Sequence, residues 1–86
     1  MCLSCLEMKA LIAFSAWHEA RVMAEDWAGE ARSRASGRME AWSRGMDAPV
    51  SDRDLLQMEE VAARLRWRAD WLEEVYRTAH KAVLDF

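Results

Sequence analysis

Two cysteines near the start of the sequence have a spacing that could support chemistry. Cys2 and Cys5 form a C-x-x-C motif, which occurs in zinc sites and in proteins that exchange disulfides. A tetrahedral zinc site needs four ligands, and the sequence contains no second cysteine pair. The alternative is that both are small apolar residues in a frayed helical turn. A metal- or redox-responsive switch through Cys2 and Cys5 is therefore one functional hypothesis, and no cofactor is expected.

The two histidines have neighbours that resemble acid–base sets. His18 lies next to Glu19 and three residues after Ser15, and His80 follows Glu73 in the same region of the chain. General acid–base catalysis requires such groups to be held together in a pocket. A charged helical surface produces neighbours of this kind by chance, and the sequence has no loop that would build a pocket. We therefore expect a non-enzymatic protein.

Tryptophan and arginine combine in a third cluster. The segment 65–76 reads LRWRADWLEEVY, with two tryptophans four residues apart among charged residues. Tryptophan and arginine dominate the energetics of protein interfaces, and a clustered exposed apolar patch usually marks a contact. The cluster predicts a surface for a protein partner. The predicted partner-binding residues are Trp67, Trp71, Arg64, Arg68, Asp70 and Leu56.

The arginines also support an alternative, a nucleic-acid-binding regulator. Arginine beside an aromatic side chain that stacks on a base is typical of single-strand binding sites. The net charge of −3 and the acidic neighbours oppose extended contact with phosphates, and no known nucleic-acid-binding module is recognisable. The predicted residues would form one belt across the middle of the folded chain: Arg32, Arg34, Arg64, Arg66 and Arg68.

The composition indicates what kind of element positions these residues. Ala, Glu, Lys, Leu and Arg make up 44 of the 86 residues, which is typical of long helices and coiled coils. Three glycines and one proline leave few places to turn the chain, and β-branched residues, which favour strands, are scarce. The sequence predicts one small all-α domain covering residues 1–86.

One segment interrupts the helical pattern, RGMDAPVSDRD at positions 44–54. Gly45 suits the left-handed residue that follows a helix, and Pro49 opposes continuation of the helix. Ser51 or Asp52 can cap the next helix, and Ser51 with Asp54 forms an imperfect capping box. We predict a helix over about 3–44, a turn over about 45–51 and a helix over about 52–85.

The second predicted helix carries an apolar seam with alternating steps of three and four residues, which is typical of a coiled coil. The seam residues are Leu55, Met58, Ala62, Leu65, Ala69, Leu72, Tyr76, Ala79, Val83 and Phe86. Val61, Val75 and Ala82 widen the seam on one side. Trp67 and Trp71 fall at positions f and c of this heptad, and both should therefore point away from the seam.

The first predicted helix has a similar seam that changes phase. Its seam runs through Leu3, Leu6, Ala10, Ala13, Trp17, Ala20, Ala24, Trp27 and Ala31, and then continues through Ala35, Met39, Trp42 and Met46. The same rhythm would have required Arg34 and Arg38, so the shift predicts a stutter that locally unwinds the coil. Because helix propensity is low around Ser36–Gly37, this helix is either bent or broken there. We expect one bent helix.

Two such helices should pack antiparallel as a hairpin. The midpoint of the turn predicts that facing residues have numbers that sum to about 96, which would leave Met1 to about Leu11 overhanging. Apolar residues cover more than one face of the first helix, and one hairpin cannot bury them all. We therefore expect a homodimer that forms a four-helix bundle. Its predicted self-association core is Leu55, Met58, Leu65, Leu72, Tyr76, Trp17 and Trp27.

The sequence favours a small cytoplasmic protein that binds and occludes a protein partner. The apolar run at positions 10–17 is too short to span a bilayer, and no basic region precedes it. We expect no membrane association. Inhibitors, anti-activators and phage-encoded anti-defence proteins act by occlusion from small helical scaffolds, an analogy at the level of the fold alone.

Overall fold

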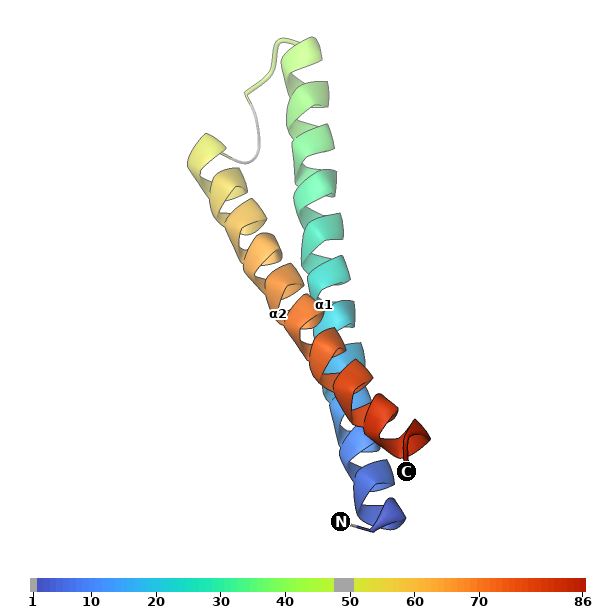
Figure 1. Cartoon of the computed structure of the whole chain (residues 1–86). Helices are drawn as coiled ribbons and strands as arrows, with labels where there is room; N and C mark the ends of the chain where they lie inside the picture. The colour runs from blue at the N-terminus through green and yellow to red at the C-terminus, as the bar shows by residue number, and fades with distance from the viewer. Residues whose placement is uncertain (1, 48–50) are drawn as a thin grey trace.

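Two long helices pack against each other in the computed structural model, which describes residues 2–47 and 51–86. Helix α1 spans Leu3–Ser43 and helix α2 spans Asp52–Leu84, and they run antiparallel with both termini at one end (Figure 1). The hairpin is 65 Å long and 16 by 14 Å across. The described residues include no strand. The predicted all-helical architecture of two packed helices is confirmed, whereas pairing into a four-helix bundle stays a prediction.

The ends of the helices at the loop are set by local hydrogen bonds. After α1, Gly45 has a φ of 71°, and its N–H donates to the carbonyl of Trp42 at 3.0 Å. The N–H of Met46 donates to the carbonyl of Ala41 at 2.9 Å, so the two bonds form a Schellman motif. At the start of α2 the hydroxyl of Ser51 accepts a hydrogen bond from the N–H of Asp54 at 3.2 Å. The cap is therefore Ser51 rather than Asp52.

The predicted turn at 45–51 lies only partly within the described residues. Pro49, which we predicted to stop the helix, is outside them. The rest of the predicted turn, residues 45–47 and Ser51, belongs to neither helix.

The interface between the helices is built on alanine. The buried residues in the described part of the chain are Ala10, Ala20, Ala24, Ala31 and Ala69. The predicted seam of α2 faces α1 and is at least partly buried from Leu55 to Val83. Phe86 is the exception, with 68% of its surface exposed, because it follows the end of α2. Its assignment to the seam is wrong.

The register of the two helices differs from the predicted one. The ring of Phe14 contacts the ring of Tyr76 at 5.3 Å between centroids, and Arg38 forms an ion pair with Asp52. The numbers in both pairs sum to 90, not to about 96, which corresponds to a shift of about 9 Å along a helix. The prediction was wrong because α2 begins beside Arg38, so that the end of α1 runs past it (Figure 1).

This register also changes which end of the hairpin overhangs. Ala10 is buried, and Leu6 lines a groove together with Ala79 and Ala82 of α2. The predicted overhang of the segment up to Leu11 is therefore wrong. The last turn of α1 projects instead, and Trp42 within it is exposed.

Helix α1 continues through Ser36–Gly37 without a break. The predicted phase shift is seen only in part: Ala35 of the shifted seam is half-buried and Arg34 is exposed, but Met39 is exposed, and Arg38, a position of the original rhythm, is half-buried. The side chain of Arg38 is only 11% exposed. Its guanidinium lies 4.3 Å from the centroid of the Trp42 ring, and its Nε has no hydrogen-bond partner among the described residues. The helix thus accommodates a buried arginine rather than unwinding.

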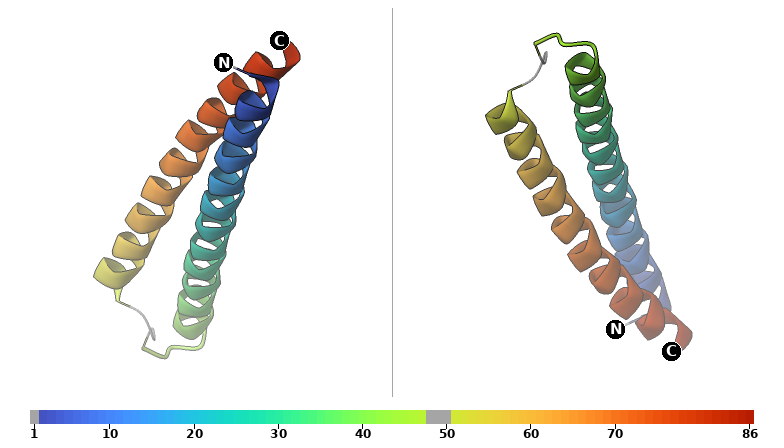
Figure 2. Two further views of the ribbon diagram at one scale, coloured as in Figure 1. Left: turned by 90° about the horizontal axis from the view of Figure 1, so that it is seen from below. Right: turned by 90° about the horizontal axis from the view of Figure 1, so that it is seen from above.

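The two helices diverge toward the loop and lie closer together near the termini (Figure 2). Alanines fill the middle of the seam, whereas Arg38, Leu55 and Met58 occupy it near the loop. Larger side chains at a contact increase the distance between helix axes.

In the described residues, neither helix contains a stretch that is both long and apolar enough to cross a membrane.

Replacing Gly45 or Gly37 with alanine should change the free energy of unfolding in opposite directions. Gly45→Ala places a Cβ on a residue with positive φ and should lower the free energy of unfolding by about 1 kcal/mol. Gly37→Ala lies inside α1, where no atom comes within 4 Å of the added Cβ, and should raise it by about 0.5–1 kcal/mol. Urea unfolding followed by circular dichroism measures both. Changes of the same sign would contradict the assigned ends of α1.

Candidate protein-binding surface

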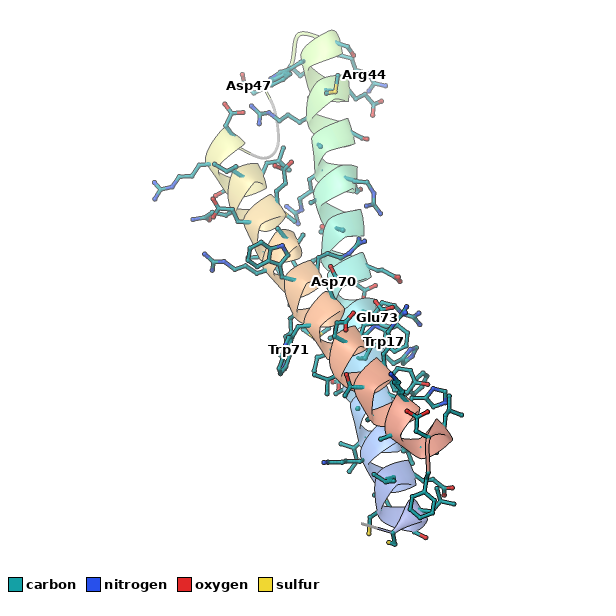
Figure 3. All side chains as sticks on the ribbon, viewed as in Figure 1. Trp17, Arg44, Asp47, Asp70, Trp71 and Glu73 are labelled. Atoms are coloured by element: carbon teal, nitrogen blue, oxygen red, sulfur yellow. The ribbon has the colours of Figure 1, made fainter. Side chains whose placement is uncertain are left out.

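Trp67 and Trp71 are exposed on the outside of the hairpin. Their exposed fractions are 79% and 65%, and Leu56 on the same helix is also exposed. Residues four apart on a helix lie on one face, so the two indoles are neighbours. Trp71 projects from one side of α2, whereas Asp70 and Glu73 project from the other (Figure 3). The hairpin alone therefore leaves both tryptophans in contact with water.

Two arginines flank the tryptophans on the same side. Arg64 and Arg68 are exposed, and within residues 2–47 and 51–86 neither forms an ion pair. Arg68 lines a hollow of about 310 Å³ between the helices together with Glu19 and Met23. The four residues Trp67, Trp71, Arg64 and Arg68 are called the tryptophan surface below. The guanidinium groups of Arg64 and Arg68 are available to acidic groups of a partner.

Asp70 does not belong to the tryptophan surface. One of its carboxylate oxygens lies 3.6 Å from Nε of Arg66, and both residues line a groove on another side of the hairpin. Successive residues on a helix point about 100° apart, so Asp70 and Trp71 are neighbours in sequence only. The structure therefore separates Asp70 from the other predicted partner-binding residues.

An apolar groove continues the tryptophan surface toward the termini. Its volume is about 430 Å³, and Val75, one turn after Trp71, forms part of its wall. The residues that line it are Leu6, Lys9 and Ala13 of α1 with Glu74, Val75, Thr78, Ala79 and Ala82 of α2. We did not predict this groove, although Val75 and Ala82 widen the seam on that side. That widening is the signal in the sequence that could have identified it.

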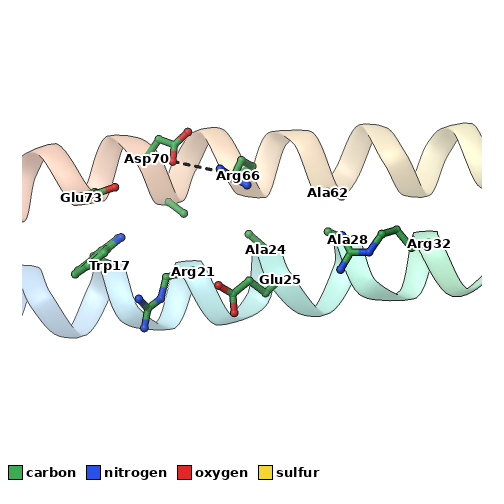
Figure 4. Close-up of a pocket in the computed structure, with 11 residues that line it drawn as sticks. Trp17, Arg21, Ala24, Glu25, Ala28, Arg32, Ala62, Arg66, Asp70 and Glu73 are labelled. Atoms are coloured by element: carbon green, nitrogen blue, oxygen red, sulfur yellow. Dashed lines mark ion pairs between the residues drawn. The ribbon is translucent and has the colours of Figure 1, made fainter.

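The opposite side carries a charged groove of about 290 Å³. Its alanine lining includes Ala24 and Ala62, and charged side chains from both helices form its walls (Figure 4). The charged residues are Arg21, Glu25 and Arg32 of α1 with Arg66, Asp70 and Glu73 of α2. Three positive and three negative groups balance, so the groove has no net charge that would attract phosphates.

The predicted arginine belt is not formed as one surface. Arg32 and Arg66 line the charged groove, whereas Arg68 lies on the side of Trp71. Arg34 donates from its Nε to Glu30 at 2.8 Å. The belt was predicted from a register near 96, and the observed register brings different residues together. Of the five arginines, only Arg64 and Arg68 share the tryptophan surface.

The predicted self-association core lies mostly between the helices of one hairpin. Leu55, Met58, Leu65, Leu72, Tyr76 and Trp17 are half-buried there, whereas Trp27 is 40% exposed. Trp17 and Tyr76 stack with ring centroids 5.5 Å apart, and Phe14 meets Trp17 edge-on at 5.8 Å. These rings connect α1 to α2. Their role between two copies stays a prediction.

The histidines pack against aromatic rings. His18 lies parallel to Phe14 with centroids 6.1 Å apart, and its Nδ1 is 3.1 Å from a nitrogen of Arg21. His80 stacks on Tyr76 at 5.5 Å. Both histidines are exposed, and their ring contacts are with aromatic neighbours and Arg21 rather than with a carboxylate.

Cys2 and Cys5 lie side by side at the start of α1. Their Sγ atoms are 2.8 Å apart, and both are exposed free thiols. Among residues 2–47 and 51–86, no group of three or more His, Cys, Asp or Glu side chains is placed to hold a metal ion. One chain thus brings two of the four ligands that a tetrahedral site needs.

Replacing the exposed tryptophans should leave the hairpin folded. The double variant Trp67→Ala, Trp71→Ala should change the free energy of unfolding by no more than about 0.5 kcal/mol, because these side chains contact little protein. The control Trp17→Ala should destabilise by about 2 kcal/mol, roughly half the value for a fully buried tryptophan. Urea unfolding compares them. A double variant that loses helix content would show that the tryptophans belong to the core of an assembly.

Comparison with protein-family models, with curated proteins and with solved structures finds no match to this chain. The geometry of the tryptophan surface and its adjoining groove therefore carries the functional argument.

Proposed function

We propose that the protein acts by binding another protein through the tryptophan surface. The observation that carries this proposal is the exposure of Trp67 and Trp71, at 79% and 65%, on one face of α2. A tryptophan buries about 150–250 Å² at a contact, and each Å² of apolar surface removed from water contributes roughly 25 cal/mol. Covering both side chains would therefore favour association strongly, and their surroundings determine what can cover them.

The chemistry of the surface favours an amphipathic partner helix with acidic flanks. The apolar groove next to the tryptophan surface has an apolar lining of one leucine, one valine and three alanines, with Lys9, Glu74 and Thr78 also among its lining residues, and a helix lays its apolar face into a groove of this kind. Arg64 and Arg68 offer guanidinium groups at the edge, where carboxylates of the partner would pair with them. The 65 Å length of the hairpin leaves room for about 800 Å² of contact, the area typical of one side of a stable interface.

The expected mechanism is occlusion. Both helices are continuous over the described residues, so the tryptophan surface is carried by a long helical scaffold. A protein of this form would inhibit a partner by covering the site at which the partner works. Inhibitors, anti-activators and phage-encoded anti-defence proteins are the functional classes that this mechanism fits, by analogy of fold alone.

A nucleic-acid-binding regulator is the second candidate. It is favoured by the placement of Arg64 and Arg68 beside the exposed ring of Trp67, since a base can stack on an indole while arginines contact phosphates. The separation of Arg32 and Arg66 into the charged groove and the ion pair of Arg34 with Glu30 weaken it. The binding of a protein therefore has the stronger support.

Photo-cross-linking should locate the partner on the tryptophan surface. A photoreactive phenylalanine analogue at position 71 should give an adduct with a different protein in the native host. The same analogue replacing Glu25, which lines the charged groove, should give none. Adding Arg64→Glu and Arg68→Glu should abolish the adduct at position 71, because acidic groups of the partner would then be repelled. Mass spectrometry of the adducts measures these outcomes.

Light scattering on a sizing column distinguishes a foreign partner from a second copy. A monomer at low micromolar concentration would leave the tryptophan surface open for the partner. A dimer that cross-links only to itself at position 71 would contradict the proposal, since the tryptophans would then form the core of the predicted four-helix bundle.

Binding to nucleic acid should be absent at physiological salt. A labelled single-stranded oligonucleotide should show no change in fluorescence anisotropy with added protein, because the net charge of −3 opposes phosphate contacts. Binding that weakens steeply with salt and disappears in the variant Arg64→Gln, Arg68→Gln would support the second candidate instead. Gln in place of Arg32, which lies on the other side of the hairpin, is the matched control.

A further inference from the structure

A pair of exposed thiols occupies the start of α1, remote in the sequence from the tryptophan surface. Cys2 immediately precedes the helix, and its carbonyl accepts hydrogen bonds from the N–H groups of Cys5 and Leu6, both at 3.1 Å. The two Sγ atoms are 2.8 Å apart. Residues three apart in a helical turn have Cα atoms about 5 Å apart, which is within the range that a disulfide spans. The backbone therefore already has a conformation that permits the bond.

We propose that Cys2 and Cys5 form a redox-active dithiol that closes reversibly to an intrachain disulfide by exchange with a small-molecule disulfide such as oxidised glutathione. This property is independent of the partner-binding function proposed above. It rests on the adjacent thiols, on their exposure to solvent and on the helical turn that holds them together.

The two thiols have different roles because their surroundings differ. The pKa of Cys2 is lowered, first by its side-chain hydrogen bond with Cys5 and then by the backbone N–H of Cys5, with a smaller effect from Ser4. The neutral Cys2 thiol donates to Sγ of Cys5 and makes no capping hydrogen bond, so the backbone N–H groups act mainly on the thiolate. N–H groups at the start of a helix favour negative charge, and the thiolate is the nucleophilic form. Cys2 is therefore the attacking residue.

The thiol–disulfide exchange takes place in two steps. The thiolate of Cys2 attacks one sulfur of the small disulfide, forms a mixed disulfide with it and releases the other half as a thiolate. Cys5 then loses its proton to solvent and attacks Sγ of Cys2, which releases the second half. Two protein thiols are oxidised and one small disulfide is reduced to two thiols. The second step is fast where the resolving sulfur is adjacent, as it is here.

Equilibration of the whole chain in glutathione buffers tests the proposal. With a rising ratio of oxidised to reduced glutathione, intact mass spectrometry should show a monomeric species lighter by about 2 Da, the two hydrogens lost on oxidation. Its midpoint should not depend on protein concentration. Persistent glutathione adducts, disulfides between chains, or no reaction at all would overturn the proposal.

Single variants separate the two roles. Cys5→Ser should stop the reaction at a stable glutathione adduct on Cys2, because the resolving thiol is gone. Iodoacetamide should modify Cys2 in that variant faster than it modifies Cys5 in Cys2→Ser, because the backbone N–H groups at the start of the helix still favour the Cys2 thiolate. Equal rates, or faster modification of Cys5, would overturn the assignment of Cys2 as the attacking residue.

Discussion

The close contact of alanines between α1 and α2 is the constraint on which the rest of the structure depends. Each buried residue in the described part of the chain is an alanine. Small side chains let two helices approach closely, but each removes little apolar area from water. The larger apolar residues are therefore displaced to the edges of the seam or to the outside, where Trp67, Trp71 and Ile12 are exposed. The surface that we propose for binding follows from this seam.

The helices could be predicted from the sequence, but their register could not. Gly45 ends α1 and Ser51 caps α2 through local hydrogen bonds. The ends of both helices can therefore be recognised from the residue types near these positions. A heptad seam repeats along the chain, and sliding one helix past the other presents similar apolar faces again. The pairing of Arg38 with Asp52 and the contact of Phe14 with Tyr76 are features of one register, and neither follows from periodicity. The midpoint of a turn is a poor guide where one helix runs past the other.

Part of the candidate site could also be predicted from the sequence, and part of it could not. The outward direction of Trp67 and Trp71 follows from their distance from the seam, which the heptad specifies. The side of the hairpin on which a residue lies depends in addition on how the second helix is placed. For that reason Asp70 was assigned to the tryptophan surface, although it pairs with Arg66 in the charged groove. The groove along Val75 and Ala82 needs both helices to form, so no single-helix pattern revealed it.

The two sides of the hairpin differ in charge and in exposed apolar surface, and this difference favours binding on the tryptophan side. On one side, exposed apolar residues adjoin arginines without an ion pair in the described chain, and a partner can satisfy both. On the other side, acidic and basic groups of the charged groove already balance each other; exposed pairs of this kind contribute little to stability, but they keep that side hydrated. An apolar partner helix of the kind proposed would gain more free energy on the tryptophan side, because on the charged side it would have to displace water from six ionised groups. The same sequence that leaves the tryptophans uncovered thus also restricts where a partner can bind.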